Sequence, residues 1–169
     1  MNWIFENNIN TDLITPGRYN ITTDPKALAK IAFIEHLPEF SKKVKEGDFI
    51  IAGNNFGCGS SRETAVTALK HSGIQAVIAQ SFARIFYRNA LNQGLLVLIA
   101  DTNNIDKNDE IKLDYKNRII HNKTKNIQIE FEMPDTLYRL YKADGIINYI
   151  KNNGLDAIEE LFTGESNDK

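Results

Sequence analysis

The stretch GNNFGCGSSRE at residues 53–63 decides how the centre of this chain folds. It follows the apolar run FIIA at residues 49–52, which is typical of a buried strand. Gly57 and Gly59 have no Cβ, so the loop can turn tightly at positive φ and come close to a ligand. Apolar residues then recur at helical spacing until Gly73, a residue type that commonly ends helices. The stretch therefore predicts a strand, a glycine loop and a helix in succession.

The polar residues at the end of this loop predict an anion site. Ser60 and Glu63 have the spacing of a capping box, a pattern that usually marks only the start of a helix. Ser61 and Arg62 add a second hydroxyl and a guanidinium at the same place. The first turn of a helix has backbone N–H groups without intrahelical acceptors and carries the positive end of the helix dipole. Together these groups favour a carboxylate or a phosphate.

Other chemistries fit the loop less well. The nucleotide-binding pattern Gly-x-x-x-x-Gly-Lys-Ser/Thr is absent from the sequence, and so is the dinucleotide fingerprint. Cys58, between the two glycines, would need a histidine partner to act as a nucleophile, and none is close in the sequence. We therefore interpret Cys58 as a small loop residue.

The segments after the first helix continue the alternation of strand and helix. Residues 74–79 are a β-rich run, residues 82–93 have helical spacing and end before Gly94, and residues 95–99 form another apolar run. This succession predicts parallel strands joined by crossover helices. Ligands bind such sheets at the carboxyl ends of the strands, and we expect the glycine loop to lie there.

The pattern changes in the C-terminal third. Residues 111–115 and 127–131 alternate apolar and polar side chains, which predicts half-buried strands in antiparallel pairing. Helical spacing then returns, and residues 164–169 are expected to be a frayed tail. The prediction is a single α/β domain over residues 1–163, with a parallel strand–helix core and additional antiparallel strands.

Composition and charge argue against several classes of partner. The chain has 169 residues, of which 42% are hydrophobic, and a net charge of −2. This balance gives no electrostatic reason to expect a nucleic acid or a membrane surface as a partner. No apolar run approaches the length of a membrane span, and the first residues lack the pattern of a signal peptide. We expect a cytoplasmic protein.

Candidate metal ligands are few. The chain has one cysteine, and its three histidines share no ligand spacing: His36, His71 and His121. An iron–sulfur cluster is usually held by several cysteine thiolates. We predict that this chain holds no metal and that each histidine is a surface or packing residue.

Several separate blocks of the sequence resemble one family. GNNFGCGSSRE (residues 53–63) and GIQAVIAQSFARIFYRNALNQGLLVL (residues 73–98) are similar to the small subunits of 3-isopropylmalate dehydratases, which correspond to the swivelling domain of the aconitase family. NINTDLITPGRY (residues 8–19) and PEFSKKVKEGDFIIAG (residues 38–53) are similar in order and spacing. The resemblance implies a swivelling domain of β/β/α type. It also implies a hydro-lyase that interconverts 2- and 3-isopropylmalate in leucine biosynthesis, with a 4Fe-4S cluster on a separate large subunit.

The resemblance also implies roles for individual residues. Ser60 corresponds to the catalytic base, which would act as an alkoxide. Ser61 and Arg62 would hold a carboxylate of a small dicarboxylic hydroxy acid. Asp12 matches an acidic position that helps to order the site, and the two loop glycines support it. A serine anion needs stabilisation, which the loop N–H groups, the helix start and Arg62 are expected to supply.

The segment after Arg18 is expected to select the substrate. In similar proteins, an arginine in this loop suits a distal carboxylate, and apolar residues suit a branched alkyl group. Ile21 is apolar, which favours the isopropyl group. The chain departs from the family at residues 64–66, which read Thr-Ala-Val where His-Ala-Pro is usual. A methylmalate-type or homoaconitate-type small subunit therefore stays open, as does a non-catalytic anion-binding or regulatory module of the same fold.

Two arginines in the second helix have no assigned role. Arg84 and Arg88 are four residues apart and therefore share one helix face. One interpretation is that they add positive potential near the anion site. The favoured interpretation is that they brace the fold or meet acidic groups at an interface.

Overall fold

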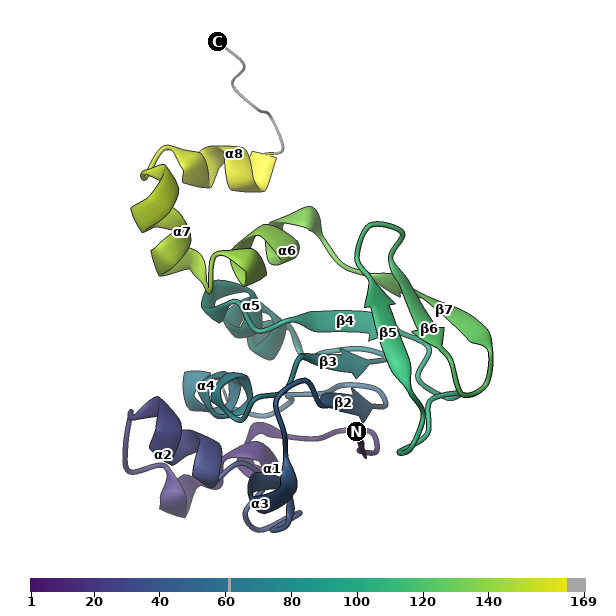
Figure 1. The fold of residues 1–169 in the computed structure, drawn as a ribbon. Coiled ribbons are helices and arrows are strands. Elements are labelled where there is room, and N and C mark those ends of the chain that lie inside the picture. Colours follow the sequence, from purple (N-terminus) through teal and green to yellow (C-terminus); the bar gives the residue numbers. More distant parts are fainter. Residues whose placement is uncertain (61, 164–169) are drawn as a thin grey trace.

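The computed structural model describes residues 1–60 and 62–163. In these residues a seven-stranded mixed sheet has the order β1-β2-β3-β4-β7-β6-β5. Helices gather beside the parallel strands, and β5, β6 and β7 curl away on the opposite side (Figure 1). The strands are β1 (Asn2–Ile4), β2 (Phe49–Ala52), β3 (Ala76–Ala79), β4 (Val97–Ala100), β5 (Ile111–Asp114), β6 (Ile119–Asn122) and β7 (Ile127–Glu132). The helices are α1 (Thr11–Ile14), η1 (Gly17–Tyr19), α2 (Pro25–Lys30), α3 (Phe40–Lys43), α4 (Glu63–His71), α5 (Arg84–Gln93), α6 (Asp135–Lys142), α7 (Ile146–Asn153) and α8 (Ala157–Thr163).

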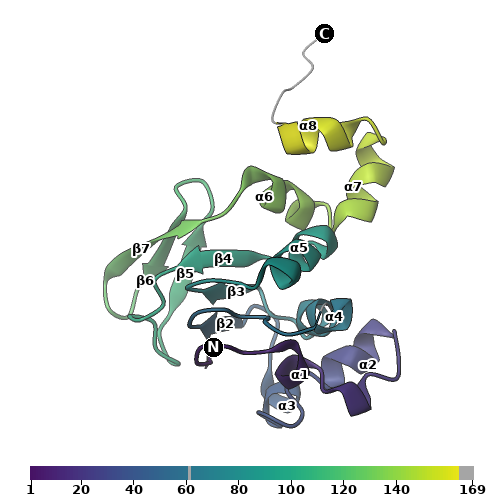
Figure 2. The same ribbon diagram turned by 180° about the vertical axis from the view of Figure 1, so that it is seen from behind.

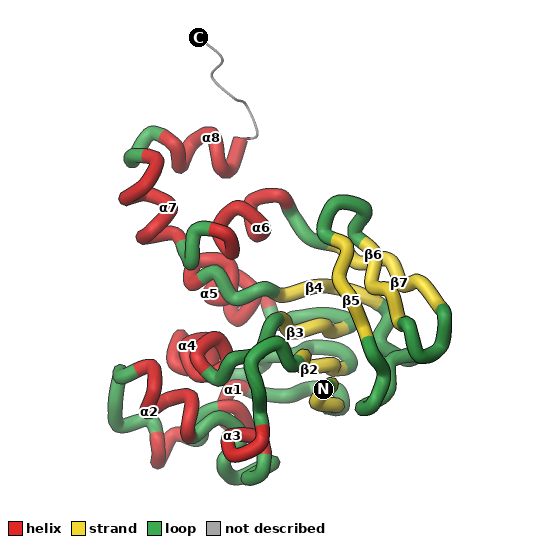
Figure 3. Tube along the Cα trace, in the orientation of Figure 1, coloured by secondary structure: helices red, strands yellow, loops and turns green. Residues whose placement is uncertain are grey.

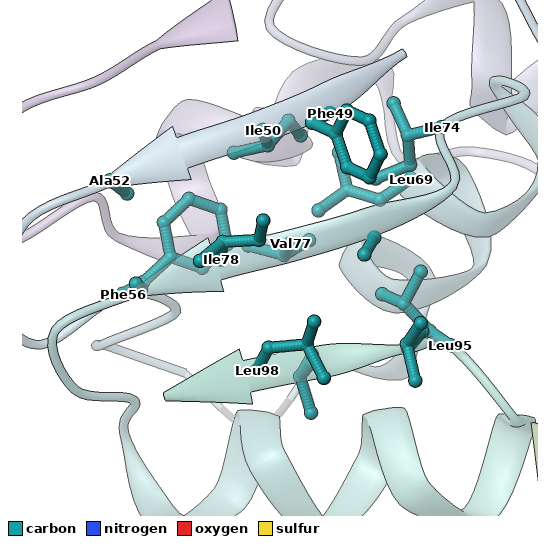
Figure 4. Packing of buried hydrophobic residues seen from close by; sticks show 14 of the residues in the cluster. Phe49, Ile50, Ala52, Phe56, Leu69, Ile74, Val77, Ile78, Leu95 and Leu98 are labelled. Atoms are coloured by element: carbon teal, nitrogen blue, oxygen red, sulfur yellow. The ribbon is translucent and has the colours of Figure 1, made fainter. Parts of the chain in front are cut away.

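Strands β1 to β4 are parallel and form the half of the sheet that carries the candidate site. Helix α4 connects β2 to β3, and α5 connects β3 to β4. Every residue of β2 and β3 is buried, as expected for parallel strands covered on both faces. Leu69 of α4 packs near Phe49 and Ile74, within the apolar cluster that joins the helices to the sheet (Figure 4).

The antiparallel half begins where β7 pairs with β4, with Phe131 opposite Ala100. β6 pairs with β7 and β5 pairs with β6, both antiparallel. Burial along β7 alternates, with intermediate or buried residues at every second position and exposed ones between them. This alternation follows from a strand that has one face on the core and one in solvent.

The remaining helices flank this sheet. Asp24 caps α2 by accepting a hydrogen bond of 2.8 Å from the N–H of Ala27. Helices are concentrated on one side of the molecule and strands on the other (Figure 3). Helices α7 and α8 follow α6 (Figure 2), and α8 returns to it, where Thr136 Oγ1 donates to the Leu161 carbonyl at 2.9 Å. In the described part of the chain, no helix is both long and apolar enough to cross a membrane.

The predicted α/β fold class with parallel and antiparallel strands is confirmed. β3 and α5 each begin two residues later than predicted, at Ala76 and Arg84. Helix α5 ends at Gly94 as predicted, in the left-handed conformation. Strands β1 and β6 are missing from the sequence prediction. The predicted tail at residues 164–169 lies outside the described residues, and the domain boundary stays a prediction.

Candidate active site

The glycine loop leaves the carboxyl end of β2 and has the predicted backbone conformation. Gly57 and Gly59 have φ values of +79° and +96°. A Cβ on Gly57 would lie 2.1 Å from the Phe86 ring, which is far inside van der Waals contact. A Cβ on Gly59 would lie 3.4 Å from Thr11 Oγ1. Gly57 is therefore needed both for its φ and for close packing on α5, whereas Gly59 is needed mainly for its φ.

The segment before α1 holds one side of the loop. The N–H of Gly57 donates to the carbonyl of Ile9 at 2.7 Å. The N–H of Thr11 donates to the carbonyl of Cys58 at 2.8 Å, and Asn10 and Cys58 form a parallel bridge. These bonds place the start of α1 directly beside the loop.

The segment before α5 holds the other side. The N–H of Phe56 donates to the carbonyl of Ser81 at 3.0 Å, and the N–H of Ala83 donates back to the carbonyl of Phe56 at 2.9 Å. The rings of Phe56, Phe82 and Phe86 meet at centroid distances between 5.3 and 6.3 Å. The glycine loop is therefore fixed between the starts of α1 and α5.

Ser60 is exposed at the end of the loop, and its hydroxyl does not cap the helix. The predicted capping role is wrong, because α4 begins at Glu63 with Arg62 at its N-cap and has no side-chain hydrogen bond there. Thr11 holds Ser60 instead. Its Oγ1 lies 3.2 Å from Ser60 Oγ and donates to the Ser60 carbonyl at 3.1 Å. Stabilisation of a Ser60 anion by the helix start is correspondingly weaker than the sequence suggests.

Arg62 is bound to the start of α1. It forms an ion pair with Asp12, and its Nη1 donates to the carbonyl of Thr15 at 3.3 Å. The side chains of Arg62 and Asp12 are 30% and 57% exposed, so both can be reached from solvent. The guanidinium lies against Gly17, where a Cβ would be in ordinary van der Waals contact at 3.4 Å from Nη2. The structure thus brings Ser60, Arg62 and Asp12 together beside the two glycines.

Two further site residues were predicted, Ser61 and Ile21. Ser61 lies outside the described residues. Ile21 is 89% exposed and borders a hollow of about 610 Å³, which is also lined by Thr64. Thr64 is the first residue of the departure from the family pattern. Its Oγ1 and the Oδ1 of Asn20 are buried and have no hydrogen-bond partner in the described part of the chain.

Sequence reasoning missed a network of side-chain amides at the carboxyl edge of the parallel strands. Asn7 Oδ1 accepts from the N–H of Asn54 at 2.6 Å, and Asn54 Nδ2 donates to Gln80 Oε1 at 2.8 Å. Gln80 Nε2 donates to Asn103 Oδ1 at 3.1 Å. This chain of bonds ties the root of the glycine loop to the ends of β1, β3 and β4. The sequence does carry a signal for this network, because an Asn or Gln follows each of the four parallel strands within a few residues.

Candidate metal ligands are dispersed. In residues 1–60 and 62–163, no three His, Cys, Asp or Glu side chains form a group that could hold a metal ion. The Nδ1 of His71 lies 2.9 Å from the carbonyl of Thr67, and the ring of His36 stacks on Phe5 at a centroid distance of 6.0 Å. Both histidines have ordinary structural surroundings.

Comparison with known proteins identifies the protein family of this chain. Residues 2–103 match the family described as the aconitase C-terminal domain. The chain belongs to this family.

Its relatives include small subunits of hydro-lyases. The chain is 49% identical over 154 residues to 3-isopropylmalate dehydratase small subunit 2 of Archaeoglobus fulgidus, covering 90% of this chain and 93% of that one. It is 52% identical over 154 residues to the methanogen homoaconitase small subunit of Methanocaldococcus jannaschii, covering 89% of each. A solved structure of 3-isopropylmalate dehydratase from Methanocaldococcus jannaschii superposes with a TM-score of 0.87 at 46% identity, covering 94% of this chain and 96% of that one.

Proposed function

We propose that this chain is the small subunit of a 3-isopropylmalate dehydratase, which interconverts 2- and 3-isopropylmalate in leucine biosynthesis. The observation that carries the proposal is the group formed by Ser60, Arg62 and Asp12 at the mouth of a glycine loop, in a chain whose relatives are named small subunits of this enzyme. The reaction removes water from one position and adds it back the other way round. The chain's contribution is a base and a carboxylate site.

Ser60 is the proposed base. As an alkoxide it would take the proton from a carbon next to a substrate carboxylate and return it during rehydration. The cluster of the large subunit would supply the Lewis acid that takes up the hydroxide leaving the neighbouring carbon. The Thr11 hydroxyl lies 3.2 Å from Ser60 Oγ, and by turning its single proton from the Ser60 carbonyl it could donate a hydrogen bond to this oxygen. A donor beside a developing anion lowers the energy of the charged form. The exposed position of Ser60 gives a substrate access to it.

Arg62 is the proposed carboxylate ligand, together with Ser61. A guanidinium has five N–H donors in a planar fork and can bind two carboxylates at once. Asp12 occupies part of this fork and orients it, and the rest stays available for substrate. We assign Asp12 a positioning role for this reason.

The hollow beside Ile21 and Thr64 is the proposed site for the group that distinguishes substrates. Ile21 offers an apolar surface, which suits the isopropyl group. A homoaconitate-type substrate would carry a third carboxylate into this region, where Ile21 provides no cation. The relatives include an isopropylmalate dehydratase and a homoaconitase small subunit at similar identity, so identity alone does not choose the substrate. We base the choice of isopropylmalate on the apolar side chain of Ile21.

The iron–sulfur cluster of the proposed enzyme would belong to the large subunit. This chain has one cysteine, Cys58, and its carbonyl and neighbours are occupied in holding the glycine loop. Its residues do not fit a cluster, which needs several thiolates. We propose that a cluster-bearing large subunit completes the active site and that the assembly works in the cytoplasm.

The test is turnover by the purified chain mixed with the large subunit from the same organism. The substrates are isopropylmalate, a methylmalate and homoaconitate, each compared by kcat/KM. The proposal expects isopropylmalate to be preferred, and neither subunit to turn it over alone. Preference for a methylmalate or for homoaconitate would assign a sister hydro-lyase, and binding without turnover of any substrate would indicate a non-catalytic module.

A further inference from the structure

Arg84 and Arg88 lie beside the glycine loop on the outward face of α5. Both are exposed, and with Gly57, Gly59 and Ile85 they line a hollow of about 470 Å³. The hollow borders Gly59, the residue that precedes Ser60 in the chain. We call this hollow and its two arginines the arginine face.

The two guanidiniums have no ion pair or hydrogen bond within the part of the chain that the structure describes, although ten ion-pair contacts are formed there. They therefore do not brace the fold through such contacts, and this part of the favoured interpretation is wrong. Their positions are also locally unfavourable. Like charges four residues apart repel on a helix, and Arg84 occupies the first position of α5, where a cation opposes the helix dipole.

The arginine face also contains an exposed apolar side chain. Ile85 lies between the two arginines in sequence and is 41% exposed. Exposed apolar side chains next to arginines are common in protein interfaces. A small diacid would leave Ile85 in water, whereas a protein surface can bury it and pair both guanidiniums. The loop backbone at Gly57 and Gly59 has no side chains to keep a partner away.

We propose that the arginine face is the docking surface for an acidic patch of the large subunit. The inference rests on the proposed function, which requires a partner to close over Ser60. Pairing with carboxylates relieves the repulsion between Arg84 and Arg88. It also brings the partner against the loop that carries Ser60 and Arg62. The hydrogen bonds between Phe56 and the segment before α5 keep the arginine face in fixed register with that loop.

The experiment measures the dissociation constant between the chain and the purified, cluster-loaded large subunit by titration calorimetry. The variants are Arg84→Glu, Arg88→Glu, the corresponding single alanine variants and the double reversal. Arg139→Glu is the matched control, since Arg139 is an arginine in α6 without an ion pair in the described residues. Thermal melting verifies that each variant is folded. If a charge-reversal variant does not fold, the alanine variant at the same position is used in its place.

We expect each reversal to weaken binding by about tenfold or more and the double reversal by about a hundredfold, with a smaller effect at high salt. The control should stay within about twofold of the natural chain. Unchanged affinity of the folded double variant would overturn the inference while leaving the proposed function intact. A raised KM with unchanged subunit affinity would also overturn it, because the arginines would then hold substrate. Absence of any binding by the natural chain would instead count against the proposed function.

Discussion

Asp12 and Arg62 are 50 positions apart in the sequence and form an ion pair at the mouth of the glycine loop. The pair joins the first turn of α1 to the residue that precedes α4. It therefore fixes the guanidinium that we propose as the carboxylate ligand. An ion pair this exposed contributes little to stability, so its value lies in orientation.

Asp12→Asn should affect the orientation of the Arg62 guanidinium without a large effect on the stability of the fold. We expect the free energy of unfolding to change by less than about 1 kcal/mol, because the pair is largely exposed. The reconstituted enzyme should lose at least about tenfold in kcat/KM, since a neutral amide holds the guanidinium more weakly than the carboxylate does. The control is Glu35→Gln, which breaks the exposed pair with Arg18. Equal activity of the two variants would show that Asp12 does not position the site.

Gly57→Ala should disrupt the loop itself. The new Cβ would lie 2.1 Å from the Phe86 ring at a φ of +79°, so both packing and backbone are strained. We expect a loss of about 2 kcal/mol or more in the free energy of unfolding. Gly47→Ala is the control, because Gly47 also has positive φ but a methyl group added there would have nothing within 4 Å. Equal destabilisation of the two variants would mean that the Phe86 contact is unimportant.

Ile21→Arg tests substrate selection. An arginine could gain a charge-assisted hydrogen bond worth about 1.5–3 kcal/mol with a distal carboxylate, and an alkyl group would leave it unpaired. We expect the kcat/KM ratio to shift toward tricarboxylic substrates by about tenfold or more. Ile147→Arg, at a 62% exposed position on α7, is the control. An unchanged ratio would place Ile21 outside the substrate pocket.

Asp109 should make the antiparallel half sensitive to acid. The N–H of Asp106 and the amide of Asn122 hold the pKa of Asp109 below its ordinary value, and the ammonium of Lys125 adds to this effect. The stabilisation is therefore present above the ordinary carboxyl pKa of about 4 and is lost as the pH falls through the lower folded value.

Asp109→Asn should accordingly lower the free energy of unfolding by about 1–3 kcal/mol at pH 7, because buried hydrogen bonds lose their charged acceptor. Urea unfolding at several pH values measures the difference, which should shrink below about pH 4. Asp156→Asn changes an exposed carboxylate and should have little effect at any pH. A deficit that is the same at every pH would contradict the assignment to Asp109 ionisation.

The parallel half was predictable because its signals are local. Apolar runs bounded by glycines mark β2, β3 and β4, and Gly94 marks the end of α5. β1 is only three residues long and depends on pairing with β2, so its own sequence carries little information.

The sequence indicated Ser60, Arg62 and Asp12 as candidate site residues, but it did not indicate their contacts. Ser60 has a capping-box sequence, yet its hydroxyl lies within hydrogen-bond distance of Thr11, a residue from another segment. The link between Asp12 and Arg62 likewise depends on how α1 packs beside the loop. Local patterns identify polar groups, but tertiary packing decides which partners they meet.

The most direct test of the central claim is the turnover of isopropylmalate by Ser60→Ala in complex with the large subunit. Ser60 is exposed and does not cap α4, so its loss should lower the free energy of unfolding by less than about 1 kcal/mol. Ser72→Ala, near the end of α4, is the matched serine control. We predict a folded variant with normal subunit affinity and a fall in kcat of at least about a hundredfold, as expected for loss of a general base. Near-normal turnover in that folded complex would contradict the account.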